Sequence, residues 1–232
     1  MIVLAIDTAL DYCAAAVLDA GARTMIAQET LEMKRGHAEA LMPLIDRVMK
    51  ASGIAYLGLD RIAVTTGPGS FTGLRVGISA ARGIGLAADK PVIGLTTLSA
   101  YVAPLVAEQK EQPVVAAIDA RHDHVYFQVV AGNGSALMRP AVVPIEDTFV
   151  ASRFGALRMV GNAARILADR WPRNVPPPSL VDPRPGPDIA WVAWMGAATD
   201  PAAAPAKPFY LRPPDAKPKP GFIHPSVSGS RV

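Results

Sequence analysis

Cysteine is nearly absent from this sequence of 232 residues, and long apolar runs are absent altogether. The single cysteine, Cys13, excludes an internal disulfide framework and a zinc cluster of cysteines. Aspartate, glycine or proline interrupts the longest apolar runs well before the roughly 20 residues that are needed to cross a bilayer. We therefore expect a protein that does not associate with membranes and that works in a reducing compartment, the cytoplasm.

Charge is sparse as well, since only 19% of the residues are charged and the net charge is +3. Most of the excess lies in residues 201–232, where five cations oppose Asp215. A charge excess this small does not predict a nucleic-acid surface. The opening residues MIVLAIDTAL contain Asp7 and carry no basic residue ahead of the apolar run. They therefore predict a buried strand and not a secretory signal.

One segment recurs at an offset of 112 residues, because IVLAIDTALDYCAAAV from Ile2 aligns with VVAAIDARHDHVYFQV from Val114. Each copy has an apolar run that ends in aspartate, a short polar turn and a second apolar run, which predicts a β-hairpin. The alternative is that any two hairpins with aspartate in the turn look alike. We favour a duplication, because the matches lie on both strands and in the turn. It predicts a first lobe at residues 1–105 and a second at 106–217, followed by a mobile tail at 218–232.

Hydrophobic periodicity predicts the elements between the two copies. An amphipathic helix is expected at residues 37–49 and a second helix at 71–88, with strands at 60–66 and 91–95. In the second half, residues 114–145 suggest three strands, and residues 152–171 suggest mixed helix and strand. Strands that alternate with helices indicate an α/β sheet with parallel members.

Two strands that end in aspartate, within duplicated domains, resemble the actin, Hsp70 and sugar-kinase superfamily. This resemblance implies two tandem RNase H-like α/β lobes, the second reduced, which in the superfamily clasp ATP and Mg²⁺. The turns DTALD and DARHD contain no glycine, so a Cβ at each position hinders the approach of phosphate to the backbone. One interpretation is that a nucleotide is held between Asp7 and Asp119. The alternative, which we favour, is that both side chains only cap their turns, as degenerate remnants of a nucleotide site.

Small residues recur every fourth position along the helix expected at residues 71–88, at Gly73, Gly77, Ala81 and Gly85. They form one face without bulky side chains, which lets a neighbour approach closely. Three helical glycines cost about 3 kcal/mol relative to alanine, and close packing must offset that cost. The neighbour can be internal, either the sheet or the helix at 37–49, or it can be another protein. A third alternative, GPGSFTG as a phosphate-binding loop, lacks the GKS or GKT ending.

The same region carries a resemblance to one particular protein family. The segment GPGSFTGLRVGISAARGIGLAADKPVIGLTTL, together with VLAIDTA, IDAR, VY and YLRPPDAKP, is similar to the TsaB family over nearly the whole chain to about Pro220. The resemblance implies a non-catalytic subunit that pairs with a catalytic paralogue, TsaD. That pair transfers threonylcarbamoyl to N6 of adenosine 37 in tRNAs that read codons beginning with A. It further implies contact with the ATPase TsaE through the complex and tRNA binding only in the assembled complex, and it allows a homodimer of the lone protein.

Catalysis, a metal site and a cofactor are not expected here. In TsaD the strand after the glycine helix leads into a His-x-x-x-His pair that binds the metal, whereas Thr97 and Tyr101 stand at these positions in this chain. Neither residue is a normal ligand of such a metal. The competing interpretation is an independent ATP-dependent phosphotransferase that uses Asp7 and Asp119.

The resemblance also implies where the partner binds, because the glycine helix and the helix before it form the heterodimer face in the family. The expected interface residues are Leu41, Leu44, Ile45, Val48, Gly73, Gly77, Ala81 and Gly85.

Overall fold

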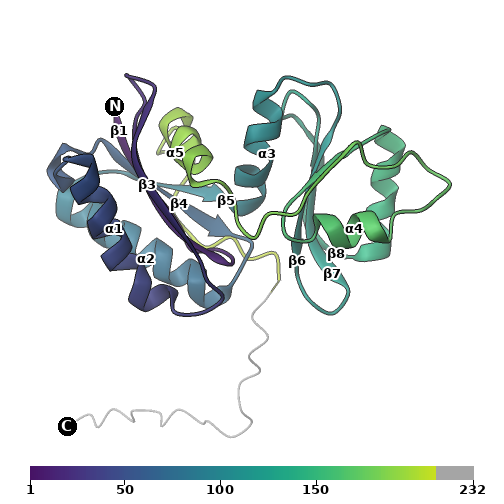
Figure 1. Ribbon diagram of the computed structural model, residues 1–232, viewed down its shortest axis with the longest axis horizontal. Coiled ribbons are helices and arrows are strands. Elements are labelled where there is room, and N and C mark those ends of the chain that lie inside the picture. Colours follow the sequence, from purple (N-terminus) through teal and green to yellow (C-terminus); the bar gives the residue numbers. More distant parts are fainter. Residues whose placement is uncertain (213–232) are drawn as a thin grey trace, which may run out of the picture.

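The computed structural model describes residues 1–212, which fold into two lobes that each contain one five-stranded sheet (Figure 1). The predicted tail at 218–232 lies outside the described residues. In the order of the first sheet, the strands are β3 (Thr24–Glu32), β2 (Tyr12–Asp19), β1 (Ile2–Asp7), β4 (Arg61–Gly67) and β5 (Val92–Thr96). Strands β1, β2 and β3 pair antiparallel, whereas β4 and β5 continue the sheet in parallel.

The second sheet repeats this topology. In the matching order its strands are β8 (Ala136–Pro144), β7 (His124–Val130), β6 (Val114–Asp119), β9 (Arg158–Val160) and β10 (Leu180–Asp182). The first three pair antiparallel and the last two pair in parallel. Strand β6 lies 112 residues after β1 and has the same length, as the sequence repeat predicts. The expectation of two tandem α/β lobes of the same topology is therefore confirmed.

The second lobe is the reduced one, also as predicted. Its last two strands have three residues each, where their counterparts in the first lobe have seven and five. A 3₁₀ helix, η2 (Ile145–Phe154), and the short helix α4 (Ala164–Asp169) cover one face of its sheet.

Two long helices cover one face of the first sheet, and a third helix covers the other face (Figure 1). Helices α1 (His37–Ser52) and α2 (Phe71–Ala88) pack on the first face, beside the 3₁₀ helix η1 (Tyr56–Gly58). Successive side chains of β1 point to opposite faces of the sheet. Leu4 and Ile6 face these two helices, whereas Val3 and Ala5 face α5 (Ile189–Ala198).

Helix α5 corrects the predicted domain boundary, which placed residues 106–217 in the second lobe. The chain returns to the first lobe at Ile189, where α5 packs on β1, β2 and β4. Gly196 of α5 lies directly against Ala63 of β4, and the amide of Gly94 donates to the carbonyl of Ala204 at 2.8 Å. The first lobe therefore contains residues 1–107 and 189–212.

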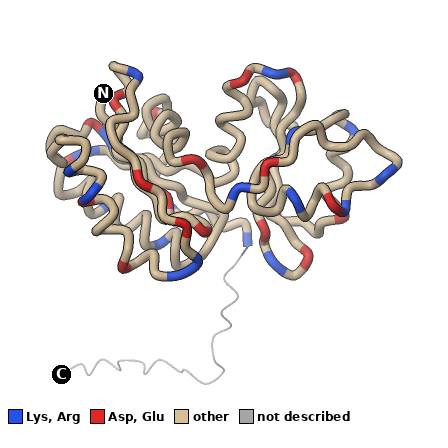
Figure 2. The backbone as a smooth tube through the Cα atoms, viewed as in Figure 1, with Lys and Arg blue, Asp and Glu red and all other residues tan. Residues whose placement is uncertain are grey.

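Helix α3 (Thr97–Ala107) joins the two lobes. Leu98, Tyr101, Val102 and Leu105 pack in one core with residues of β6, so the two lobes share buried apolar surface. Cations and acidic side chains are interspersed over both lobes (Figure 2). Within the described residues 1–212, no helix combines the length and the apolar character that a membrane span requires.

Candidate functional site

Asp7 is the last residue of the central strand β1, at the end of the sheet where the parallel strand β4 also ends. Its side chain is completely buried. Its Oδ1 accepts hydrogen bonds from the amide of Ala9, at 3.1 Å, and from the hydroxyl of Thr65. Its Oδ2 has no hydrogen-bond partner among the described residues. Because Asp7 is 0% exposed, neither carboxyl oxygen reaches the surface in this arrangement.

The GPGS segment covers the turn after Asp7. The amide of Ser70 donates to the carbonyl of Ala9 at 2.7 Å, and the hydroxyl of Thr8 donates to the carbonyl of Gly73 at 2.7 Å. A Cβ at Gly69 would overlap the carbonyl oxygen of Ala9, so only glycine permits this contact. The backbone of the segment fills the space in front of the turn, and its Ser70 amide is already bound. The Ser70 amide is therefore not available to a phosphate group.

Burial changes the acidity of Asp7. It raises the pKa of this carboxyl from 3.8 to about 6, while the hydrogen bonds from Thr65 and the Ala9 amide lower it by less. The folded state thus holds the proton more tightly than the unfolded chain does. The stability that Asp7 contributes is fully present below the unfolded pKa and is lost as the pH rises through about 6.

Asp119, the counterpart of Asp7 in the second lobe, is exposed. Its Oδ1 accepts from the amide of Arg121 at 2.7 Å, which repeats the contact between Asp7 and Ala9. The next turn residues, Arg121 to Asp123, all have positive φ, between 52° and 64°. Both aspartates thus accept from the amide two residues ahead, as the capping alternative predicts. One is buried and the other is exposed, so the two do not form a matched pair of ligands.

Thr97 and Tyr101 lie on the first turns of α3 and are both buried. The phenol of Tyr101 donates to the carbonyl of Arg184 at 2.9 Å, and burial raises the pKa of this phenol. The hydroxyl of Thr97 has no partner among the described residues. In residues 1–212 no group of three or more His, Cys, Asp or Glu side chains is placed to hold a metal ion.

The structure corrects the expected partner interface. Its eight residues are all buried inside the first lobe, namely Leu41, Leu44, Ile45, Val48, Gly73, Gly77, Ala81 and Gly85. The glycine row rests on the sheet, because a Cβ at Gly77 would overlap the hydroxyl of Thr8 and one at Gly85 would overlap Val92. The close neighbour of the row is therefore internal, and none of these side chains can reach a partner.

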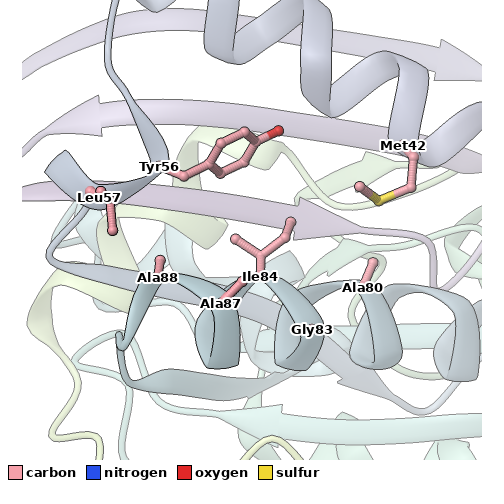
Figure 3. A pocket seen from close by; sticks show the side chains of 8 residues that line it. All are labelled: Met42, Tyr56, Leu57, Ala80, Gly83, Ile84, Ala87 and Ala88. Atoms are coloured by element: carbon pink, nitrogen blue, oxygen red, sulfur yellow. The ribbon is translucent and has the colours of Figure 1, made fainter.

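The outer faces of the same helices form an apolar groove instead (Figure 3). It has a volume of about 620 Å³ and is lined by Met42, Tyr56, Leu57, Ala80, Gly83, Ile84, Ala87 and Ala88. Leu57 is 74% exposed at one end. A largely exposed leucine at an apolar groove is typical of a surface that binds another protein.

Sequence reasoning missed this groove, although the sequence contains a signal for it. Ala80, Gly83 and Ala87 form a second row of small residues on α2, and nothing lies within 4 Å of a Cβ at Gly83. Gly83 is two residues from both Ala81 and Gly85, so it points away from the first row.

Comparisons with known proteins agree with this description. The family model of TsaD, tRNA N6-adenosine threonylcarbamoyltransferase, matches residues 24–152, which is more than half of the chain. The tRNA threonylcarbamoyladenosine biosynthesis protein TsaB of Haemophilus influenzae is 39% identical over 127 residues, covering 55% of this chain and 52% of that protein. The chain thus matches about half the length of this curated relative.

Other relatives match over almost the whole chain. An uncharacterized protein of Mycobacterium tuberculosis is 30% identical over 216 residues, covering 93% of this chain and 94% of that protein. A crystal structure from Pseudomonas aeruginosa, of an uncharacterized protein with similarity to peptidase YeaZ, is 28% identical with a TM-score of 0.76. It covers 91% of this chain and 99% of that chain. The chain therefore belongs to the family of TsaD, and its resemblance to the members named TsaB is confirmed.

Proposed function

We propose that this protein is the non-catalytic subunit that binds a TsaD-like partner and enables threonylcarbamoyl transfer to N6 of adenosine 37 in tRNA. It acts in the cytoplasm, meets the ATPase TsaE through that complex, and contacts tRNA only once the complex is assembled. One observation carries the proposal. The aspartate site of the first lobe is closed by the chain itself, whereas an apolar groove along the outer side of α2 is open.

The closed site argues against chemistry by this chain alone. Asp7 has no exposed surface, and the GPGS backbone covers its turn. The positions of the metal-binding histidines of TsaD hold Thr97 and Tyr101, which are also buried. A chain that keeps the family fold without an accessible site is suited to supporting a partner that has one.

The groove on α1, α2 and η1 is the proposed contact with the TsaD-like partner. Its lining is apolar apart from the Tyr56 hydroxyl, and Leu57 at its end is largely exposed. Burying such side chains against a partner removes apolar surface from water, which favours association by about 25 cal/mol per Å² before the costs of binding. The family resemblance places the heterodimer face on these two helices, and the exposed faces replace the buried residues first expected there.

The decisive experiment combines this chain with its TsaD paralogue and measures tRNA threonylcarbamoylation with each component omitted. Activity is expected only when both are present. Leu57→Asp is expected to weaken partner binding about tenfold or more, because it places a charge in the apolar contact. Val150→Asp is the matched control, since Val150 is also exposed, at 45%, but lies in the second lobe. Full modification in the absence of this chain would refute the proposal.

Two outcomes distinguish the alternatives. If Leu57→Asp abolishes self-association of the lone chain but leaves partner binding unchanged, the groove is a homodimer surface. Calorimetry can also show that the lone chain binds ATP with Mg²⁺. If Asp7→Ala or Asp119→Ala abolishes that binding, the phosphotransferase interpretation replaces the one proposed here.

A further inference from the structure

Two aromatic rings and a guanidinium group form an exposed stack at the start of α2. The ring centroids of Phe71 and Tyr210 are 5.4 Å apart, with 30° between the ring planes. The guanidinium carbon of Arg75 lies 3.8 Å from the centroid of the Phe71 ring. Phe71 is 37% exposed and Tyr210 is 41% exposed. We call these three residues the aromatic cluster.

One face of the Phe71 ring is left uncovered by the other two members. The Nε of Arg75 donates to the hydroxyl of Tyr210 at 3.4 Å. Groups on opposite sides of a ring could not approach each other so closely, so Arg75 and Tyr210 lie on the same side of Phe71. A flat ligand that stacks on the opposite face would therefore displace neither of them.

The backbone holds the aromatic cluster in place from both sides. Phe71 follows Ser70, whose side chain caps α2 by accepting from the amide of Gly73 at 3.3 Å. Tyr210 follows Phe209, whose amide donates to the carbonyl of Thr66 at the end of β4, at 2.8 Å. Because both of these hydrogen bonds are formed within the chain, the rings are already held in place before a ligand binds. Binding therefore does not have to include the entropic cost of ordering them.

The charged side chains of the helix that carries Phe71 and Arg75 are all cations. Helix α2 contains Arg75 and Arg82 and no acidic residue among its 18 residues. Exposed aromatic rings beside cations bind single-stranded nucleic acid, because the rings stack on bases and the cations attract phosphates.

We propose that the aromatic cluster is a stacking site for one unpaired nucleotide of RNA, an inference that rests on the proposed function in tRNA modification. Gly83, in the apolar groove, is about 18 Å further along α2 at 1.5 Å per residue. The aromatic cluster also differs from the groove in character, because a guanidinium and a phenol hydroxyl border its rings. This combination favours a nucleobase over a second protein contact.

The test measures binding of a fluorescent anticodon stem-loop RNA to the complex with the TsaD paralogue, by anisotropy. Phe71→Ala and Tyr210→Ala are each expected to weaken binding about tenfold, which corresponds to about 1.4 kcal/mol. Tyr210→Phe keeps the ring and is expected to bind nearly as well as the wild type. Ile166→Ala is the matched control, because Ile166 is also a helical residue that is 37% exposed.

Arg75→Gln is expected to weaken binding and to reduce the slope of log affinity against log salt by about 1. Unchanged RNA affinity in the two alanine variants would overturn the inference. A second outcome would also overturn it. If these variants assemble poorly with the partner but the assembled fraction binds RNA normally, the aromatic cluster is a protein contact.

A second measurement keeps the inference separate from the proposed function. A stem-loop that contains 4-thiouridine is cross-linked to the full-length chain, both alone and mixed with the TsaD paralogue, and the attachment sites are mapped by mass spectrometry. Cross-links at residues 71–75 or 210 in either sample support the inference, even if the mixture does not modify tRNA. Cross-links found only elsewhere in the mixture, or none there, would refute it even if the complex modifies tRNA.

Discussion

Gly77→Ala tests whether the glycine row of α2 faces the sheet. The added methyl group would overlap the hydroxyl of Thr8 and would also contact Val64 of β4. That hydroxyl donates to the carbonyl of Gly73 at 2.7 Å, so moving it aside also weakens a buried hydrogen bond. The substitution thus strains a contact that the helix uses to sit on the sheet.

The expected change in the free energy of unfolding is the sum of one stabilising and two destabilising effects. Alanine favours the helix over glycine by about 1 kcal/mol. Overpacking a tight contact costs about 1 to 3 kcal/mol, and the weakened hydrogen bond costs about 1 kcal/mol. We expect Gly77→Ala to lower the free energy of unfolding by about 1 to 3 kcal/mol.

Gly83→Ala is the matched control on the same helix. Nothing lies within 4 Å of its added methyl group, so only the gain in helix propensity remains, about 0.5 to 1 kcal/mol. Thermal unfolding of both variants by circular dichroism should place the melting temperature of Gly77→Ala several degrees below that of Gly83→Ala, at about 2 to 4 °C per kcal/mol. Equal stability of the two variants would refute the assignment of the glycine row to the interior.

Three further predictions concern buried polar groups. Asp7→Asn should gain stability relative to the wild type as the pH rises from 4 to 7, by about 2 kcal/mol over this range for a pKa raised from 3.8 to about 6. Urea denaturation at each pH measures this gain, and a difference independent of pH would contradict the buried carboxyl. Tyr101→Phe removes the hydrogen bond to a carbonyl before α5 and should lower the free energy of unfolding by about 1 kcal/mol, provided that the ring still packs. Arg61→Met should cost about 2 kcal/mol or more in the same assay, because the Nη1 of Arg61 donates to three carbonyls at the end of α5.

Much of the fold follows from local patterns in the sequence. The predicted helix at residues 71–88 agrees with α2, and the 112-residue repeat gives the positions of β1 and β6. These elements were predictable because periodicity and an aspartate at a strand end are properties of neighbouring residues. The family resemblance rests on the same kind of local information.

Which face of a helix is buried, and which lobe a segment joins, was decided only by the tertiary structure. Helix α2 has two rows of small residues, and its sequence does not tell which one rests on the sheet. The apolar sequence of α5, IAWVAWMGAA, likewise does not distinguish between the two sheets, and it returns to the first. Asp7 and Asp119 end equivalent strands, yet the GPGS segment covers only Asp7. Burial depends on residues that are distant in sequence, and the local pattern at either end of such a contact does not specify its partner.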